Sequence, residues 1–154
     1  MQKLKILNTR EKKEVFEELK DNYGFTGRLE GAVFLSQNQE IFLLTGGFEI
    51  IEQGMERELR IDKAGLYIGR IRLDGVELSI EGSQLIGSKA NKNIIEINDE
   101  QLEPWVTGES LEGFTGQGYH IVKHNNDFLG CAKIKNNQVK NLVAKNRRIK
   151  TLNK

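Results

Sequence analysis

The sequence predicts an α+β fold, with one helix near the N-terminus and strands through much of the remaining chain. Three observations favour this class: apolar residues recur at helical spacing after Asn8, two strand-like runs flank Asp74-Gly75, and a second set of strand patterns begins near Asn93. The chain has 154 residues, which suffice for one domain or two small ones. We therefore expect a small mixed N-terminal domain over residues 1–92 and a β-rich domain over residues 93–154.

The first helix is predicted from its capping residues and from its apolar stripe. Asn8 is a suitable N-cap, and Glu11 stands three residues later, as in a capping box. Gly24 can close the helix because glycine readily adopts left-handed geometry. The apolar positions that recur on one helix face are Val15, Phe16, Leu19 and Tyr23.

Strands follow this helix. Ala32–Leu35 and Ile41–Leu44 have strand composition and flank a turn at Ser36–Glu40. Glycines at positions 46 and 47 indicate a further turn.

A hairpin is expected next. Leu66–Leu73 and Val76–Ile80 flank Asp74-Gly75, a strong hairpin signal because both turn residues tolerate positive φ. The polar stretch Ser83–Asn93, rich in Gly, Asn and Lys, indicates a linker between the two halves.

The second half begins with a short strand and a short helix. Ile94–Ile97 is apolar and precedes Asn98, which can cap a helix with Gln101 at the third helical position. Ile97 and Leu102 stand at the spacing of a hydrophobic staple across that cap. The chain's single proline, Pro104, removes a backbone donor, so the helix should be short or kinked.

A glycine-rich loop and three strands complete the predicted fold. Four glycines lie between residues 108 and 118. Tyr119–Lys123, Phe128–Lys135 and Val139–Val143 have strand patterns. Asparagine pairs at 125–126 and 136–137 mark the two turns, since Asn accepts left-handed geometry.

The charges are unevenly distributed, although the net charge is only +1. Eight of the 23 basic residues and none of the 22 acidic residues lie after Asp127, so residues 1–127 carry a net charge of −7. Lys and Arg supply RNA affinity by neutralising phosphates, and a polyanion should be attracted to this end of the chain. The other interpretation is a solvated basic end that keeps the protein soluble.

The cysteine count and the N-terminal sequence indicate the cellular compartment in which we expect the protein. Cys131 is the single cysteine, so an internal disulfide is excluded and a reducing compartment is expected. Residues 1–6 contain no long apolar run of the kind found in signal peptides. No apolar run approaches the roughly 20 residues of a membrane span. We expect a cytoplasmic protein with no membrane partner.

No residue pattern indicates catalysis, a metal or a cofactor. Carboxylates are scattered, and neither a P-loop nor a GxGxxG sequence is present. His120 and His124 are four residues apart on a predicted strand and should share a face, but two histidines cannot complete a zinc site. Cys131 lies in an apolar strand and is expected to be packed rather than nucleophilic. We expect no catalytic residues, no metal ligands and no cofactor.

Two aromatic residues could serve recognition or packing. Trp105, the only tryptophan, could stack on an RNA base, and Tyr119 could do the same. A lone Trp on a short apolar helix is more often part of the core. We therefore expect both side chains to be buried.

Three sequence motifs from residue 93 onward resemble those of a PUA domain, a small pseudo-barrel that binds structured RNA. The stretch 102–111 (LEPWVTGESL) resembles its short helix and the following Gly-(small or acidic)-Ser-Leu turn, and 128–133 (FLGCAK) resembles its Leu-Gly-small-small-Lys strand. The stretch 139–148 (VKNLVAKNRR) resembles the Lys-Asn-x-x-Pro-Lys-x-x-Arg ending of Sun-type RNA cytosine-5 methyltransferases. Ala144 replaces the usual proline, so a different local backbone is expected there.

The resemblance implies a fold and a function. Residues 1–92 would correspond to the pre-PUA domain of those enzymes and of small ribosome-biogenesis factors, and residues 93–154 to a PUA-like β-barrel. The implied function is RNA binding in rRNA or tRNA maturation or ribosome biogenesis, with structured RNA as the partner. The expected RNA-binding residues are Gly108, Lys133, Lys140, Lys145, Arg147, Arg148 and Lys150.

The resemblance does not imply methylation by this chain. The sequence has no glycine-rich loop after a strand to hold S-adenosylmethionine, and it has one cysteine where the Sun-type enzymes use a pair. We therefore expect a non-enzyme. The alternative that the sequence leaves open is an accessory subunit that docks on a ribosome-assembly or RNA-modification protein through its acidic N-terminal domain.

Overall fold

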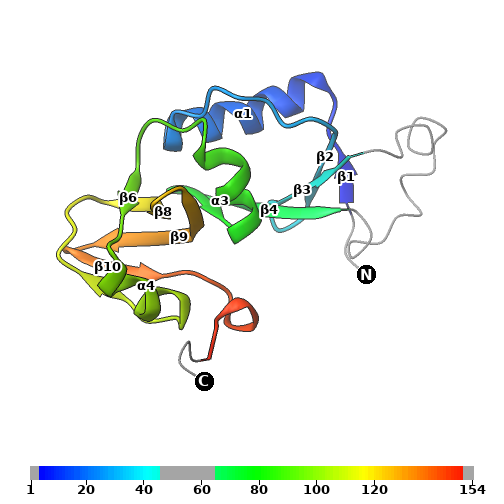
Figure 1. Cartoon of the computed structure of the whole chain (residues 1–154). Coiled ribbons are helices and arrows are strands. Elements are labelled where there is room, and N and C mark those ends of the chain that lie inside the picture. The colour runs from blue at the N-terminus through cyan, green and yellow to red at the C-terminus, as the bar shows by residue number, and fades with distance from the viewer. Residues whose placement is uncertain (1–3, 46–64, 151–154) are drawn as a thin grey trace.

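In the part of the chain that the structure describes, two five-stranded sheets form the framework of the protein (Figure 1). The structure, a computed structural model, describes residues 4–45 and 65–150, and the predicted turn at residues 46–47 lies outside them. In the first sheet each strand pairs with the next one along the chain, and all neighbours are antiparallel. Its strands are β1 (Leu4–Ile6), β2 (Ala32–Ser36), β3 (Glu40–Leu44), β4 (Leu66–Arg72) and β5 (Gly75–Leu78).

Helix α1 (Thr9–Tyr23) confirms the capping prediction. The Asn8 side chain accepts a hydrogen bond from the Glu11 amide, the Glu11 carboxylate accepts one from the Asn8 amide, and Gly24 is left-handed at φ 64°. The helix buries Val15, Leu19 and Tyr23 against the first sheet. The strand before it, β1, was not predicted, because three residues give too short a pattern to separate from loop.

Helix α3 (Ile80–Gly87) corrects the prediction of a strand to residue 80 followed by a linker. Strand β5 ends at Leu78, and the Ser79 side chain caps the helix by accepting from the Gly82 amide at 2.9 Å. Two glycines in eight residues lower the helix propensity of this segment, so its composition looked like a linker. Tertiary packing overrides that propensity, because α3 contacts both sheets, chiefly through β4 and β9 (Asp127–Lys135).

The second sheet contains one parallel pair and has the order β6-β8-β9-β10-β7. β6 runs parallel to β8, and the remaining neighbours are antiparallel. Asn125, Asn136 and Asn137 have positive φ at the turns, as predicted. β7 was missed inside the glycine-rich loop. Besides β9 the strands are β6 (Ile94–Glu96), β7 (Leu111–Glu112), β8 (Gly118–His124) and β10 (Gln138–Asn141).

Helix α4 (Asp99–Val106) confirms the predicted short helix with its capping box between Asn98 and Gln101. Trp105 is 0% exposed and its Nε1 donates to the Leu129 carbonyl at 2.8 Å, so it belongs to the core as expected. Tyr119 is 6% exposed and is also a core residue. Within the described residues, no helix is both long and apolar enough to cross a membrane.

The two halves share part of one core. Tyr23 of α1 packs in a cluster that includes Ile121 of β8 and Cys131 of β9, and its hydroxyl lies 3.5 Å from the Cys131 sulfur. A second cluster around Trp105 belongs to the C-terminal half. The division into domains 1–92 and 93–154 therefore stays a prediction, although the two sheets fall on either side of it.

We predict that Gly82→Ala destabilises the protein, opposite to the usual effect of this change in a helix. Alanine normally stabilises a helix over glycine by about 1 kcal/mol. A Cβ at position 82 would lie 1.9 Å from the Ile68 carbonyl oxygen, a backbone atom that cannot move aside easily. Overpacking of this kind costs about 1–3 kcal/mol. Thermal and denaturant unfolding measure it, with exposed Gln84→Ala as the control. A more stable Gly82→Ala variant would contradict the position of α3 on β4.

Candidate nucleic-acid interface

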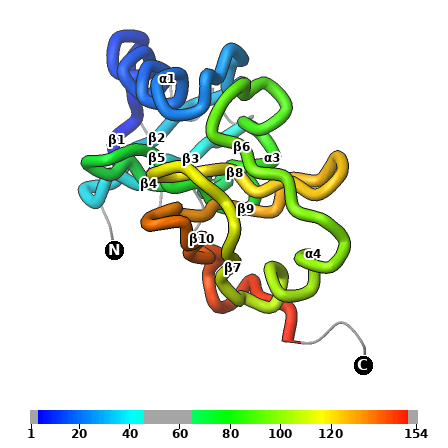
Figure 2. The backbone as a smooth tube through the Cα atoms, turned by 90° about the vertical axis from the view of Figure 1, so that its left-hand side faces the viewer, coloured from blue at the N-terminus to red at the C-terminus, as the bar shows by residue number. Residues whose placement is uncertain are grey.

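The C-terminal segment follows β10 and folds back onto the end of α4. A 3-10 turn, η4 (Lys145–Arg147), is closed by the Arg147 amide, which donates to the Ala144 carbonyl at 2.8 Å. The Ile149 amide donates to the Val106 carbonyl at 2.8 Å. The backbone over residues 144–149 therefore has a defined course, which places the basic residues at positions 145, 147 and 148. Figures 1 and 2 place this segment at the opposite end of the molecule from α1.

Asn141 holds the loops around this segment together. It is 5% exposed, and its Nδ2 donates to the carbonyls of Trp105 at 2.8 Å and Glu109 at 3.0 Å. Its Oδ1 accepts from the Val143 amide at 2.9 Å. Sequence reasoning quoted Asn141 as part of a motif but did not count it among the site residues. The Lys-Asn pair of the motif was the available signal.

Gly108 and Arg148 are two predicted site residues that the structure brings into contact. Gly108 has φ 102°, and a Cβ there would lie 2.4 Å from Arg148 Cδ and 2.7 Å from its Nε. The Arg148 Nε donates to the Val143 carbonyl at 3.0 Å. Glycine fits position 108 for two reasons. It adopts the positive φ readily, and it leaves space for the aliphatic part of the Arg148 side chain. The terminal guanidinium nitrogens have no acidic partner among the described residues.

Arg147 is paired with an acidic side chain of α3. Its Nη1 lies 2.6 Å from Oε2 of Glu81, and the two side chains are 44% and 28% exposed. Such a partly exposed pair contributes little to stability, about 0–1 kcal/mol. The pair nevertheless neutralises Arg147, which reduces its attraction for phosphate. Lys145 and Arg147 are exposed, whereas Arg148 is half-buried.

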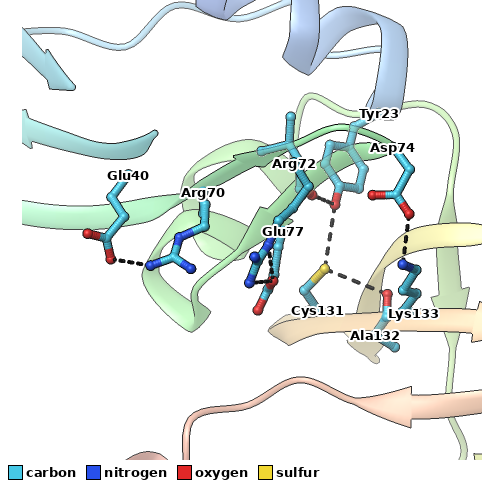
Figure 3. A network of polar contacts seen from close by, with 10 residues as sticks. Tyr23, Glu40, Arg70, Arg72, Asp74, Glu77, Cys131, Ala132 and Lys133 are labelled. Carbon is cyan, nitrogen blue, oxygen red and sulfur yellow. Dashed lines mark hydrogen bonds and ion pairs between the residues drawn. The ribbon is translucent and has the colours of Figure 1, made fainter. Parts of the chain in front are cut away.

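Lys133 lies on the sheet and is engaged by the hairpin of the other half (Figure 3). Its Nζ is 2.7 Å from Asp74 Oδ2 and 5.1 Å from the centre of the Tyr119 ring. The hydrogen bond with Asp74 raises the pKa of Lys133 and lowers the pKa of Asp74. Lys140 is the direct cross-strand neighbour of Lys133 in the β9–β10 register and is exposed. Lys133 is thus a contact between the halves, separate from the C-terminal turn.

Four predicted site residues remain available to an anion. Lys140, Lys145 and Lys150 are exposed, and no ion pair engages them within residues 4–45 and 65–150. Arg148 adds its terminal guanidinium nitrogens. Because guanidinium groups donate in a fork that matches phosphate oxygens, the arginine is suited to orient a phosphodiester while the lysines supply charge.

The histidines and the cysteine have structural contacts. His120 Nδ1 lies 3.0 Å from the Gly118 carbonyl oxygen, and His124 Nε2 lies 2.8 Å from Asp99 Oδ1. Among the described residues no group of three or more His, Cys, Asp or Glu is placed to hold a metal ion. Cys131 is 1% exposed, and burial raises the pKa of its thiol to about 11. The prediction that Cys131 is packed is confirmed.

The match to a protein family covers the C-terminal half of the chain, where the candidate interface lies. Residues 92–149 match the family model described as the methyltransferase RsmF PUA domain. This match confirms the resemblance to a PUA domain that the three motifs indicated.

The individual relatives are bacterial enzymes. The chain is similar to ribosomal RNA small subunit methyltransferase F of Vibrio cholerae serotype O1, with 25% identity over 130 residues, which cover 83% of this chain and 26% of that protein. The same-named protein of Aeromonas salmonicida is 26% identical over 141 residues, covering 89% and 28% of the two chains. That of Vibrio atlanticus is 27% identical over 86 residues, covering 54% and 18%. The chain thus spans about a quarter or less of the length of these relatives.

We predict that Ala144→Pro stabilises the protein by about 0.4–1 kcal/mol, because proline restricts the unfolded chain. Ala144 has φ −58° and ψ 142°, which proline adopts readily, so the backbone at this position is compatible with the proline of the family motif. The Ala144 carbonyl would still accept from Arg147. Thermal unfolding tests the change, and Ala144→Gly should shift the melting temperature in the other direction. A lower melting temperature for the proline variant would show that this turn has another conformation.

Proposed function

We propose that this protein is a non-catalytic RNA-binding protein that acts in rRNA or tRNA maturation or ribosome biogenesis. In this proposal residues 93–154 are a PUA-like domain that contacts structured RNA, and residues 1–92 are a pre-PUA-like domain that packs against it. The PUA match over residues 92–149 supports RNA binding. The name of these relatives, ribosomal RNA small subunit methyltransferase F, supports rRNA as the class of RNA.

The observation that carries the proposal is the set of available cations on the folded-back C-terminal segment. Lys145 and Lys150 flank the turn on which Arg148 is fixed by Gly108 and by the Val143 carbonyl. A fixed guanidinium loses little conformational freedom when it binds a phosphate, whereas a free tail would lose more. This arrangement favours a phosphate-binding surface over the alternative of a merely solvated basic end.

The chemistry of Cys131 supports a non-catalytic role. A nucleophilic cysteine is partly exposed and has a lowered pKa, because the thiolate is the reactive form. Cys131 is buried, and burial raises its pKa, so its environment favours the thiol. Tyr23, whose hydroxyl contacts the sulfur, has its pKa raised by burial as well and therefore offers no base.

Docking on a separate modification enzyme remains the second proposal. The observation that favours it is the net charge of −7 on residues 1–127, which would suit a basic protein partner on the acidic parts of that surface. Copurification of a protein partner after nuclease treatment would support docking, whereas nuclease-sensitive copurification would support direct RNA binding.

We predict that RNA affinity falls steeply with salt and depends on Lys145 and Lys150. Four available cations that each neutralise a phosphate contribute about −3 to the log–log salt slope, from roughly −0.7 per contact on single strands. Lys145→Glu with Lys150→Glu should reduce affinity for a structured RNA about tenfold or more and make the slope less steep by about 1.4. Fluorescence anisotropy over a range of salt concentrations measures both quantities.

The matched control for this experiment is Lys20→Glu with Lys92→Glu. Both lysines are exposed, and the control changes the net charge by the same amount outside the C-terminal segment. Its effect should be small, because salt screens exposed charges beyond about 10 Å. Equal losses in the two double variants, or a salt-independent affinity, would mean that bulk charge rather than this segment explains binding.

We predict that the purified protein transfers no methyl group to RNA. The proposal assigns the chain to RNA binding, and its single cysteine is buried with a raised pKa. Incubation with RNA and S-adenosylmethionine carrying a labelled methyl group should leave the RNA unlabelled, while an active rRNA methyltransferase labels it in parallel. Labelled RNA that disappears with Cys131→Ser would contradict the non-catalytic proposal.

A further inference from the structure

A second group of cations surrounds a groove beside α1. The groove has a volume of about 650 Å³ and lies between the first turns of α1 and the loop before β2. In both views of the molecule α1 lies away from the C-terminal segment (Figures 1 and 2). The residues that line the groove are Thr9, Lys12, Lys13, Phe16, Gly27, Arg28, Leu29, Glu30 and Gly31.

The cations of this groove are available, unlike several of those in the C-terminal half. Within residues 4–45 and 65–150, no carboxylate pairs with Lys12, Lys13 or Arg28. The Lys12 side chain makes a long hydrogen bond, 3.5 Å from Nζ to the Gly31 carbonyl oxygen. Glu30 is the one acidic residue in the lining, so the lining carries a net charge of +2.

Apolar residues and a glycine also line the groove. Phe16 is half-buried against the core and Leu29 is buried, so the lining includes apolar surface between the cations. A fourth cation, Lys89, lies beside Gly27. The glycine leaves room for the lysine side chain, because a Cβ at position 27 would lie 2.7 Å from the Cδ atom of Lys89. Lys89 comes from the segment after α3, whose carbonyl accepts from the Thr26 amide. Three separate segments therefore bring positive charge to one place.

We infer that this groove is a second RNA contact, in which Lys12, Lys13 and Arg28 hold the phosphate backbone. The inference rests on the proposed RNA-binding function and extends it to the N-terminal half. The half-buried ring of Phe16 offers a surface on which a base or ribose can pack.

The overall acidity of residues 1–127 does not oppose this contact. Screening confines the influence of an exposed charge to about 10 Å at moderate salt, so local charge decides binding. Helix α1 carries five acidic residues, none of which lines the groove: Glu11 is paired with Lys5, and the others are Glu14, Glu17, Glu18 and Asp21. An RNA that also reaches the C-terminal segment must span the molecule, whose diameter is roughly 40 Å for 154 residues. The inferred ligand is thus an extended or structured RNA rather than a mononucleotide.

The first test is Lys13→Glu with Arg28→Glu, which reverses two exposed charges and leaves the Lys12 hydrogen bond in place. The probe is a fluorescein-labelled RNA hairpin long enough to span the protein. We expect an affinity loss of about tenfold and a salt slope less steep by about 1.4. The control Lys20→Glu with Lys92→Glu carries the same charge change outside the groove lining. An affinity within about twofold of that control would overturn the inference.

A second readout does not depend on charge. A photo-crosslinking amino acid at exposed Thr9 should crosslink to the hairpin, whereas the same amino acid at Lys20 should not. The absence of a crosslink at position 9, with normal binding in solution, also overturns the inference. If the Lys145/Lys150 variant loses affinity and the Lys13/Arg28 variant does not, only the groove is excluded. If neither variant loses affinity, the proposed RNA-binding function itself fails.

Discussion

The close packing of α3 between the two sheets is the constraint on which the remaining arrangement depends. Gly82 lets the helix approach the Ile68 carbonyl of β4, and Gly87 lets it approach the Phe128 ring of β9. Ser83 is 0% exposed, and its hydroxyl accepts from the Gly130 amide at 2.9 Å. A buried backbone amide without a partner would cost about 1–3 kcal/mol, so this hydrogen bond specifies how α3 sits on β9.

The position of the C-terminal segment follows from that packing. Glu81 in the first turn of α3 reaches Arg147, while Asn141 ties β10 to the carbonyls of Trp105 and Glu109. Gly108 then leaves space for Arg148. The segment is consequently held by contacts to α3, to α4 and to the loop after α4. These contacts explain how a short basic end can present a defined surface instead of an ensemble.

Local signals account for the parts of the fold that could be predicted from sequence. The capping boxes at Asn8 and Asn98, and the left-handed Asn125 and Asn136, depend on residues within a few positions of one another. Helix α3 depends on partners in β4 and β9, and its glycines serve close approach rather than flexibility, so composition pointed to a linker. β1 and β7 are three and two residues long and exist only through pairing with distant strands.

In the candidate site, as in the fold, features that depend on neighbouring residues could be predicted, whereas contacts between distant residues could not. The basic character of the C-terminal segment is visible in the sequence, yet the ionic partners of Lys133 and Arg147 come from Asp74 and Glu81, far along the chain. Counting charges therefore overestimates the number of cations that an anion can use.

The opposite error occurs at the other end of the molecule. The acidic total of the N-terminal half hides Lys13 and Arg28, which meet at one groove without a carboxylate partner among the described residues. Because the attraction of a surface for phosphate is decided within about one Debye length, the relevant quantity is the unpaired charge of each patch rather than the net charge of each half. By that measure the two halves of this protein differ much less than their sequences indicate, and the inference of an RNA contact at each end rests on this comparison.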